Sequence, residues 1–231
     1  MAPPPLKKRD SCRLSLATPT NQASQCRVAH SLNARIAAMP KLSAAARARK
    51  IKLILFDVDG VLTDGKIWIF PAPAGSPPTG MQPGVSLIEA KGFHAHDGTA
   101  IMLARMAGIK SGIITKRISE TVALRARDLK IDHVYQGIQD KASVFAQILE
   151  KDGITPTEAA FVGDDVIDLP AMRRCGLAIA VKNARPEVKA EAHWITAHAG
   201  GDGAARDAVE YILKAQSKWK KVVEEYMAKT D

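Results

Sequence analysis

LILFDVDGVLTDG, residues 53–65, joins an uninterrupted apolar run to a pair of carboxylates. Because the run shows no alternation of polar and apolar residues, it predicts a strand that is buried on both faces of a parallel sheet. Asp57 and Asp59 follow at once, and carboxylates at the end of a buried strand indicate that something binds them. The stretch therefore predicts a central strand that delivers both aspartates to a binding site at its carboxyl end.

Short apolar segments alternate with amphipathic segments from residue 52 onward. Strands are predicted over 52–57, 111–115, 132–135, 159–163 and 177–181, and helices over 98–107, 118–129, 141–151, 167–173, 185–191 and 203–227. This alternation predicts an α/β fold, a Rossmann-like three-layer sandwich with a mostly parallel central sheet. Ligands of such folds bind beyond the carboxyl ends of the strands, so we expect Asp57, Thr115 and Asp164 to meet there.

One segment between the first strand and the first helix departs from this rhythm. Residues 66–70 (KIWIF) and 85–91 (VSLIEAK) have the composition of two strands, and the stretch PAPAGSPPTGMQPG separates them. Its Pro and Gly content excludes a helix and predicts a β-hairpin flap over about 66–91 with a long tip. We expect this small β-hairpin cap to lie above the site, where it shields the chemistry or packs against a second subunit.

The formal net charge of +9 is confined to the start of the chain. Residues 1–50 hold ten Lys or Arg and one acid, which leaves 23 basic and 23 acidic residues in 51–231. We expect residues 1–50 to form a basic, disordered leader and residues 51–231 to form one folded domain. The Arg-rich, acid-poor leader also resembles a transit peptide or a basic arm, but it lacks the apolar core of a secretory signal.

Composition limits the compartment and the partners. No stretch approaches 18 consecutive apolar residues, which argues against a membrane span. The three cysteines, Cys12, Cys26 and Cys175, show no paired spacing, which argues against a disulfide framework or a zinc site. We therefore expect a cytoplasmic protein without a membrane partner. The neutral charge of residues 51–231 argues against nucleic acid as a partner.

Five aspartates are expected at the carboxyl edge of the sheet: Asp57, Asp59, Asp164, Asp165 and Asp168. Crowded like charges raise one another's pKa values unless a cation lies among them. Since no His–Cys pattern accompanies these carboxylates, the expected cation is Mg²⁺ rather than Zn²⁺. Mg²⁺ sites typically include a phosphate oxygen, so the pattern indicates a phosphorylated substrate.

Two further residues suit a phosphoryl group. Thr115 offers a hydroxyl at a strand end that leads into a helix, and Lys141 offers a point charge at the start of another helix. Asp57 can then act as a nucleophile, because carboxylates form aspartyl-phosphate intermediates. Asp59 points to the same side of an extended chain as Asp57 and can act as the general acid and base.

In this order, DVDGVLTDG, the strand end at Thr115, Lys141 and GDDVIDLP resemble the four motifs of the haloacid dehalogenase-like phosphohydrolases. The stretches FHAHDG, YQGIQDK and AGGDGAARD extend the resemblance, over about residues 51–220, to that family's 3-deoxy-D-manno-octulosonate 8-phosphate phosphatases. The resemblance implies Mg²⁺ as cofactor, a small phosphorylated sugar acid as substrate, and a place in lipopolysaccharide core biosynthesis. It also implies a homotetramer whose hairpins pack together, with a neighbour's C-terminal tail helping to close each site.

The same resemblance implies a role for each matching residue. Asp57 is the nucleophile and a metal ligand, Asp59 is the acid and base and binds the metal through its backbone carbonyl, and Asp164 is the third ligand. Asp165 and Asp168 support the metal site, Thr115 and Lys141 hold the phosphoryl group, and His94, His96, Asp97, Gly98, Arg117 and Arg125 contact the sugar acid, as do Asp59 and Lys141.

Three positions depart from the family pattern. Lys116 stands where glycine is usual, and His96 and Met102 stand where arginines are usual. Because His and Met cannot reproduce the bidentate grip of Arg on a carboxylate, another sugar-acid phosphate, such as a nonulosonate 9-phosphate, is an alternative substrate. An alternative of another class is a non-catalytic nucleic-acid-binding or scaffold protein that uses the basic leader.

Overall fold

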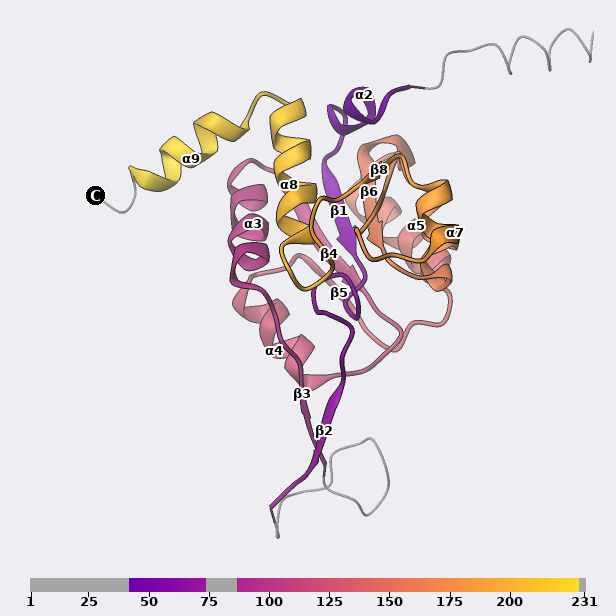
Figure 1. Cartoon of the computed structure of the whole chain (residues 1–231). Coiled ribbons are helices and arrows are strands. Elements are labelled where there is room, and N and C mark those ends of the chain that lie inside the picture. Colours follow the sequence, from indigo (N-terminus) through magenta and orange to yellow (C-terminus); the bar gives the residue numbers. More distant parts are fainter. Residues whose placement is uncertain (1–41, 74–86, 229–231) are drawn as a thin grey trace, which may run out of the picture. The chain divides into compact units, whose positions relative to one another are not determined.

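The computed structural model describes residues 42–73 and 87–228. Six strands form one sheet in the order β5–β4–β1–β6–β7–β8, and each neighbouring pair is parallel (Figure 1). They are β1 (Leu53–Phe56), β4 (Lys110–Ile114), β5 (His133–Tyr135), β6 (Ala159–Gly163), β7 (Leu177–Ala180) and β8 (Trp194–Ile195). Strand β1 lies between β4 and β6, which confirms the central position expected for it.

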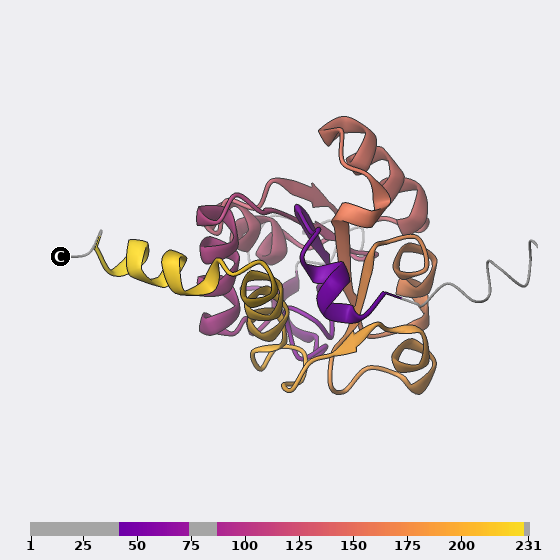
Figure 2. The same cartoon turned by 90° about the horizontal axis from the view of Figure 1, so that it is seen from above.

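Helices cover both faces of this sheet (Figure 2). One layer holds α2 (Ala44–Ala48), α3 (Ala95–Met106), α4 (Glu120–Asp128), α8 (Ala204–Ala215) and α9 (Trp219–Met227), and the other holds α5 (Lys141–Asp152), α6 (Leu169–Met172) and α7 (Pro186–Glu191). Two 3₁₀ turns, η1 (Pro156–Glu158) and η2 (Val166–Asp168), lead into β6 and α6. The predicted three-layer sandwich is confirmed. Within the described ranges, no helix has the length and apolar character needed to cross a bilayer.

The core is the apolar sheet packed between the two helical layers. Every residue of β1 and of β6 is buried, because helices cover both faces of these strands. Phe56, Phe145 and Phe161 are among the largest fully buried side chains, and each contributes about 1.5–3 kcal/mol by leaving water. This packing fixes the carboxyl ends of β1 and β6 side by side.

The predicted hairpin is formed by β2 (Trp68–Pro71) and β3 (Leu87–Ala90), which pair antiparallel with Trp68 opposite Ala90. It extends from the end of the domain to which β1 points (Figure 1). Residues 74–86, which include most of the predicted tip, lie outside the described residues. The exposed apolar side chains of the hairpin and its base are Ile67, Trp68, Ile69, Phe70 and Ile88. The hairpin therefore presents an apolar surface to solvent in the single chain.

The folded domain begins before the predicted boundary at residue 50. Helix α2 has a side-chain cap at Ser43, packs against α8, and anchors Arg47, whose guanidinium donates to the Gly176 carbonyl at 2.8 Å. The leader predicted over residues 1–50 includes Arg47 of this helix and therefore overlaps the folded domain. Residues 1–41 lie outside the described residues, and their assignment as a leader stays a prediction.

The single helix predicted over 203–227 is wrong. Helices α8 and α9 are separate because Ser217, between them, adopts a left-handed conformation with φ of 58°. The Gln216 side chain donates to the Ile51 carbonyl at 2.7 Å and so ties the break to a distant part of the chain. Neither Gly nor Pro marks this break in the sequence. Strand β8 was not predicted either, because only two residues form it.

Candidate active site

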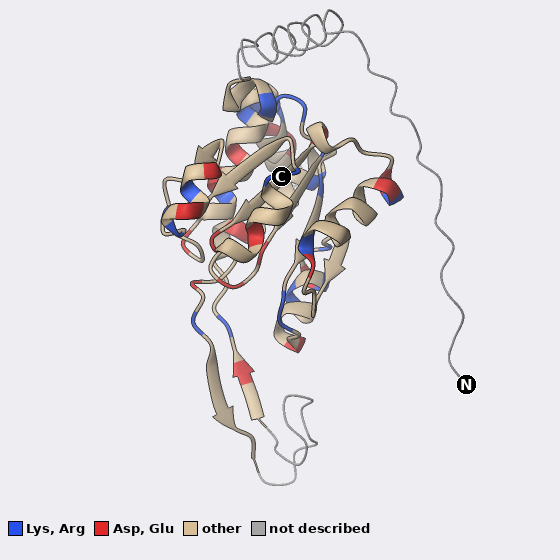
Figure 3. Cartoon of the chain, turned by 90° about the vertical axis from the view of Figure 1, so that its right-hand side faces the viewer, with Lys and Arg blue, Asp and Glu red and all other residues tan. Residues whose placement is uncertain are grey.

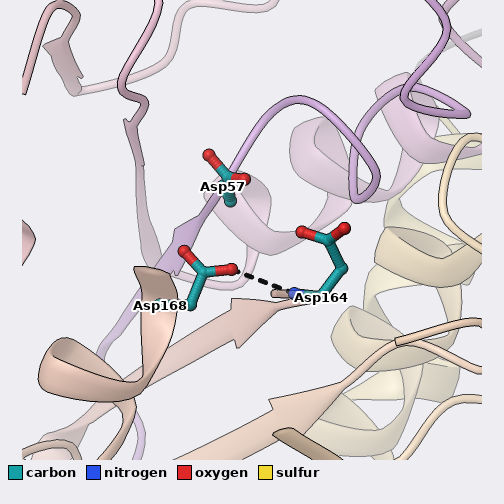
Figure 4. A group of neighbouring side chains, drawn as sticks. All are labelled: Asp57, Asp164 and Asp168. Atoms are coloured by element: carbon teal, nitrogen blue, oxygen red, sulfur yellow. Dashed lines mark hydrogen bonds between the residues drawn. The ribbon is translucent and has the colours of Figure 1, made fainter. Parts of the chain in front are cut away.

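Three aspartates converge beyond the carboxyl ends of the two central strands (Figure 4). Asp57 follows β1, Asp164 follows β6, and Asp168 lies in η2. One carboxylate oxygen from each residue lies within 4.8 Å of those of the other two. The structure thus brings Asp57 and Asp164 together at the edge where the sequence places them, in a position to share a cation.

Asp168 is fully buried, and both of its oxygens have donors. Oδ2 accepts from the backbone N–H groups of Asp164 at 3.0 Å and Asp165 at 3.3 Å, while Oδ1 accepts from Lys141 Nζ at 2.7 Å. Gly163 makes room for it, because a Cβ there would lie 2.6 Å from the Asp168 Cβ. Asp165 caps η2 with its side chain. Asp168 therefore positions the loop that carries Asp164, and its role in supporting a metal ion stays a prediction.

Lys141 places a cation among these carboxylates. It is the first residue of α5, follows the N-cap Asp140, and has a buried side chain. Its Nζ lies 2.7 Å from Oδ1 of Asp57 and 2.7 Å from Oδ1 of Asp168. Burial opposes the charged amine, but the two carboxylates outweigh burial and raise the pKa of Lys141. Lys141 is therefore an ammonium group at neutral pH, held against Asp57.

The acidic groups outnumber this single ammonium group. Burial and the Asp168 charge raise the pKa of Asp57 to about 6, although Lys141 opposes the shift. Burial, together with the charges of Asp168 and Asp57, raises the pKa of Asp164 to about 7. Oδ1 of Asp164 is buried and has no hydrogen-bond partner within residues 42–73 and 87–228, which costs free energy unless a ligand meets it. Buried oxygen donors that need positive charge fit Mg²⁺.

Thr115 lies at the same edge, immediately after β4. Its side chain is buried, and its backbone N–H donates to the Tyr135 carbonyl at 2.9 Å. Its hydroxyl accepts from the Arg117 N–H at 3.4 Å. Because β4 pairs directly with β1, the Thr115 hydroxyl occupies the strand end next to that of Asp57.

Asp59 does not join the clustered aspartates. Its Oδ1 forms an ion pair with Lys91, just after β3, and its Oδ2 lies 3.9 Å from Nε of Arg117. The Lys91 side chain is fully buried, whereas the Asp59 side chain is 19% exposed. The hairpin therefore holds the carboxylate of Asp59, and the prediction that this carboxylate faces the same group as that of Asp57 finds no contact to support it.

The hairpin contributes two charged residues that the sequence reasoning missed. Glu89 accepts from Arg117 Nη2 at 2.7 Å, and Lys91 lies between Glu89 and Asp59. Burial favours the neutral form of Glu89, but hydrogen bonds from Ser119 and Arg117 outweigh it and lower the pKa of Glu89. A signal was present, because Glu89 and Lys91 are two residues apart in an alternating strand and so point to the same side.

Residues 94–98, expected to precede the helix predicted over 98–107, are the N-cap and first turn of α3, which begins at Ala95. Asp97 is buried, and its Oδ1 accepts from the Arg206 N–H at 2.8 Å at the start of α8, where the N-cap, Gly203, has no side chain to offer. Burial raises the pKa of Asp97 against these hydrogen bonds. Asp97 therefore caps α8 with Oδ1, and its Oδ2 is buried without a hydrogen-bond partner among the described residues. Its contact with a substrate stays a prediction.

The other residues predicted to contact the sugar acid lie in two separate parts of the structure. One small cavity is lined by Arg125 together with His94, Asp97 and Gly98. Arg117 lies instead with Asp59 at the base of the hairpin. His96 is exposed, and its N–H donates to Nδ1 of His94 at 3.3 Å. The structure thus gathers the first turn of α3 with Arg125, and gathers Arg117 with the predicted acid and base.

A glycine-rich loop fixes the backbone that follows β1. Gly200 passes so close to Gly60 that a Cβ on Gly200 would lie 1.7 Å from the Gly60 carbonyl oxygen. Gly60 has a φ of 96° and approaches Asp164 in turn, since a Cβ there would lie 2.2 Å from Oδ2. Only glycine fits at both points. Residues 199–203 therefore hold the loop that follows Asp57 against Asp164.

Comparisons with known proteins identify the family of this chain. A family model described as haloacid dehalogenase-like hydrolase matches residues 111–206. The 3-deoxy-D-manno-octulosonate 8-phosphate phosphatase of Escherichia coli K12 is 39% identical over 173 residues, which cover 75% of this chain and 85% of that protein. The phosphatase of the same name from Yersinia pestis is 37% identical over 172 residues, which cover 74% of this chain and 84% of that protein.

Two crystal structures extend the likeness to three dimensions. The Yersinia pestis 3-deoxy-D-manno-octulosonate 8-phosphate phosphatase gives a TM-score of 0.68 at 36% identity and covers 77% of this chain and 88% of its own. The structure of the Moraxella catarrhalis phosphatase of that name, in complex with magnesium ion, phosphate ion and KDO, gives a TM-score of 0.70 at 35% identity. It covers 79% of this chain and 97% of its own. The shared region includes most of the described domain.

Proposed function

Because this chain belongs to the 3-deoxy-D-manno-octulosonate 8-phosphate phosphatases, a family of haloacid dehalogenase-like hydrolases, we propose that it releases phosphate from that sugar-acid phosphate. It is a phosphomonoesterase, and its products are the free eight-carbon sugar acid and inorganic phosphate. The observation that carries the proposal is the convergence of Asp57, Asp164 and Lys141 at one edge of the sheet, with Asp57 and Lys141 2.7 Å apart.

Mg²⁺ is the cofactor, and the residues present fit it. Asp57 and Asp164 would hold the ion through their carboxylates, and Asp59 through its backbone carbonyl. Asp168 belongs to the same cluster but is less suited as a direct ligand, because N–H groups and Lys141 already occupy its oxygens. When bound, Mg²⁺ supplies positive charge that neutralises the carboxylates and the phosphoryl oxygens.

Asp57 acts as the nucleophile. Its carboxylate oxygen attacks phosphorus, the bond between phosphorus and the sugar oxygen breaks, and an aspartyl phosphate forms. Lys141 orients that carboxylate, and the Thr115 hydroxyl donates to a phosphoryl oxygen. Asp59 gives a proton to the leaving sugar oxygen, then takes a proton from the water that hydrolyses the aspartyl phosphate.

Positively charged and polar side chains around the site select the sugar acid. Arg117 lies beside Asp59, so it is placed to contact the part of the sugar next to the phosphoryl group. Arg125, His94 and His96 supply further donors for the carboxylate and hydroxyl groups. A nonulosonate 9-phosphate is the alternative substrate, because His96 and Met102 replace the arginines usual in the family.

The proposal also includes the assembly, the compartment and the pathway. We expect a homotetramer in the cytoplasm that acts in lipopolysaccharide core biosynthesis. The exposed apolar side chains of the hairpin support assembly, because contiguous apolar surface on a single chain typically marks an interface. The molar mass measured by light scattering after size-exclusion chromatography tests the assembly. We expect Trp68→Glu to shift that mass toward the value of the monomer. A wild-type protein that elutes only as a monomer contradicts the tetramer.

Phosphate release from the eight-carbon and the nine-carbon substrate, measured side by side at fixed Mg²⁺, tests the activity. We expect kcat/KM to favour the eight-carbon substrate. A preference for the nine-carbon acid overturns the substrate, and release from neither overturns the phosphatase. Asp57→Asn should lower turnover by about 10⁴-fold or more while the protein stays folded; appreciable release by that variant contradicts the aspartyl-phosphate scheme.

A further inference from the structure

A basic cleft lies at the edge of the sheet opposite the active site. Its volume is about 700 Å³, and three segments line it: 49–52 before β1, 155–158 before β6, and 215–218 between α8 and α9. Because β1 and β6 begin there and Asp57 and Asp164 follow their far ends, the cleft is separate from the catalytic centre. We call it the amino-edge cleft.

The lining of the amino-edge cleft is strongly positive. Its charged residues are Arg49, Lys50, Lys52, Lys218 and a single acid, Glu158. Glu158 is neutralised by Lys52 at 2.6 Å, so three positive charges stay uncompensated. Residues 42–231 hold 26 Lys or Arg and 23 Asp or Glu, so the excess positive charge of the cleft equals that of this whole part of the chain. The link between α2 and β1, which supplies most of these charges, is at the end of the domain away from the hairpin (Figure 3).

Two of these cations are free to meet a ligand. Arg49 and Lys50 are exposed, and neither side chain has an ion-pair or hydrogen-bond partner among residues 42–73 and 87–228. Lys218 differs, because its Nζ donates at 3.1 Å to the carbonyl of Ala107, a residue outside the lining of the cleft. Neighbouring Arg and Lys side chains of this kind suit the oxygens of phosphate groups.

The size and lining decide what kind of anion fits. A volume of about 700 Å³ is within the range of small-molecule sites. The described residues that line the cleft include no aromatic side chain on which a base could stack, so a nucleic-acid strand is disfavoured. Residues 1–41 are also disfavoured as the occupant, because they hold seven Lys or Arg and one acid and so have the same sign as the cleft.

We propose that the amino-edge cleft binds a small polyanion that carries two or more phosphate groups, with Arg49 and Lys50 as the main contacts. The site is distinct from the one that performs the phosphatase reaction, and it requires neither Mg²⁺ nor the residues at the carboxyl edge. Hydroxyls of Thr157 and Ser217 in the walls offer further hydrogen bonds to phosphate oxygens.

Titration of the full chain with inorganic pyrophosphate in EDTA tests the proposal, because EDTA removes the cation that anion binding at the active site needs. Calorimetry gives the affinity, and amide shifts in a nitrogen-15 spectrum give the location. We expect saturable binding with shifts in 49–52, 155–158 and 215–218. Arg49→Gln/Lys50→Gln should weaken binding by about tenfold, since each lost exposed charge contact is worth up to about fivefold.

Arg127→Gln/Lys130→Gln is the matched control, because it removes one exposed Arg and one exposed Lys that have no side-chain partner among the described residues. It should leave the affinity within about twofold of the wild type. Absence of binding, amide shifts confined to the carboxyl edge, or equal weakening by the two double variants would overturn the proposal. Unfolding temperatures of both variants confirm that each is folded when it is titrated.

Discussion

Replacement of Gly200 by alanine should disable the active site without touching any residue of the acidic cluster. The new Cβ would lie 1.7 Å from the Gly60 carbonyl oxygen, whereas real Cβ contacts are at least 3.0 Å. The two backbones therefore have to separate by more than about 1 Å. Gly60 contacts Asp164, so the displacement passes to a residue that we assign to the metal.

The size of the effect follows from that displacement. Overpacking of this kind costs about 1–3 kcal/mol of stability, so the protein should still fold. A misplacement of about 1 Å at a catalytic site costs about 10²-fold in rate. We expect Gly200→Ala to lose turnover by that factor and to bind Mn²⁺, used as a spectroscopic substitute for Mg²⁺, at least about tenfold more weakly.

Mn²⁺ affinity measured by electron paramagnetic resonance without substrate separates positioning from general damage. Gly176→Ala is the matched control, because its Cβ would lie 2.4 Å from the Thr157 carbonyl oxygen at the opposite edge of the sheet. Both variants should unfold at lower temperature than the wild type, but only Gly200→Ala should lose Mn²⁺ affinity. Wild-type Mn²⁺ affinity in Gly200→Ala, or an equal loss in Gly176→Ala, refutes this reasoning.

Four further outcomes are expected. Lys141→Met should destabilise the protein by about 3–5 kcal/mol in denaturant unfolding and abolish turnover, because it leaves buried carboxylates without their cation; normal turnover contradicts this. Between pH 4 and about 7 the metal-free native state holds protons on Asp57 and Asp164 that the unfolded chain has lost, so stability should fall as pH rises. Thermal unfolding in EDTA at pH 5 and 8 checks that sign, and Asp164→Asn should reduce the slope. Lys91→Met should lower kcat by more than it raises KM, because it frees Asp59, whereas a change in KM alone would assign Lys91 to sugar binding. A chain that begins at residue 51 should unfold at a lower temperature than one that begins at residue 42, because it lacks α2; equal temperatures would make α2 dispensable.

Local sequence determines much of this fold. The apolar runs before Asp57 and at 159–163 predict buried parallel strands because no polar residue interrupts them, and the structure buries every residue of both. The break between α8 and α9 escaped prediction because a distant hydrogen bond, from Gln216 to the Ile51 carbonyl, stabilises it. A contact between residues so far apart in the chain leaves no periodic trace in the sequence.

Some residues of the candidate site could likewise be placed from the local sequence, and others could not. Asp57, Thr115 and Asp164 could be placed from sequence because each directly follows a strand, and parallel strands bring their carboxyl ends to one edge. Glu89 and Lys91 could be placed on one side of the hairpin strand but not at the site, because they reach Asp59 and Arg117 only through the path of β3. A sequence pattern can place a charged residue on a strand, but it does not indicate which group from a distant part of the chain pairs with that residue.

The crossing of Gly200 over Gly60 also has a consequence for the order in which the protein becomes functional during synthesis. The ribosome makes Asp57 early, and by residue 180 it has delivered every strand of the sheet except β8. The loop that holds the backbone beside Asp57 leaves the ribosome only afterwards. A nascent chain that ends before residue 199 would hold Asp57 and the sheet but would lack both this loop and α8, whose buried face completes one helical layer. Packing of the core and positioning of the backbone beside Asp57 therefore depend on the same late segment of the chain.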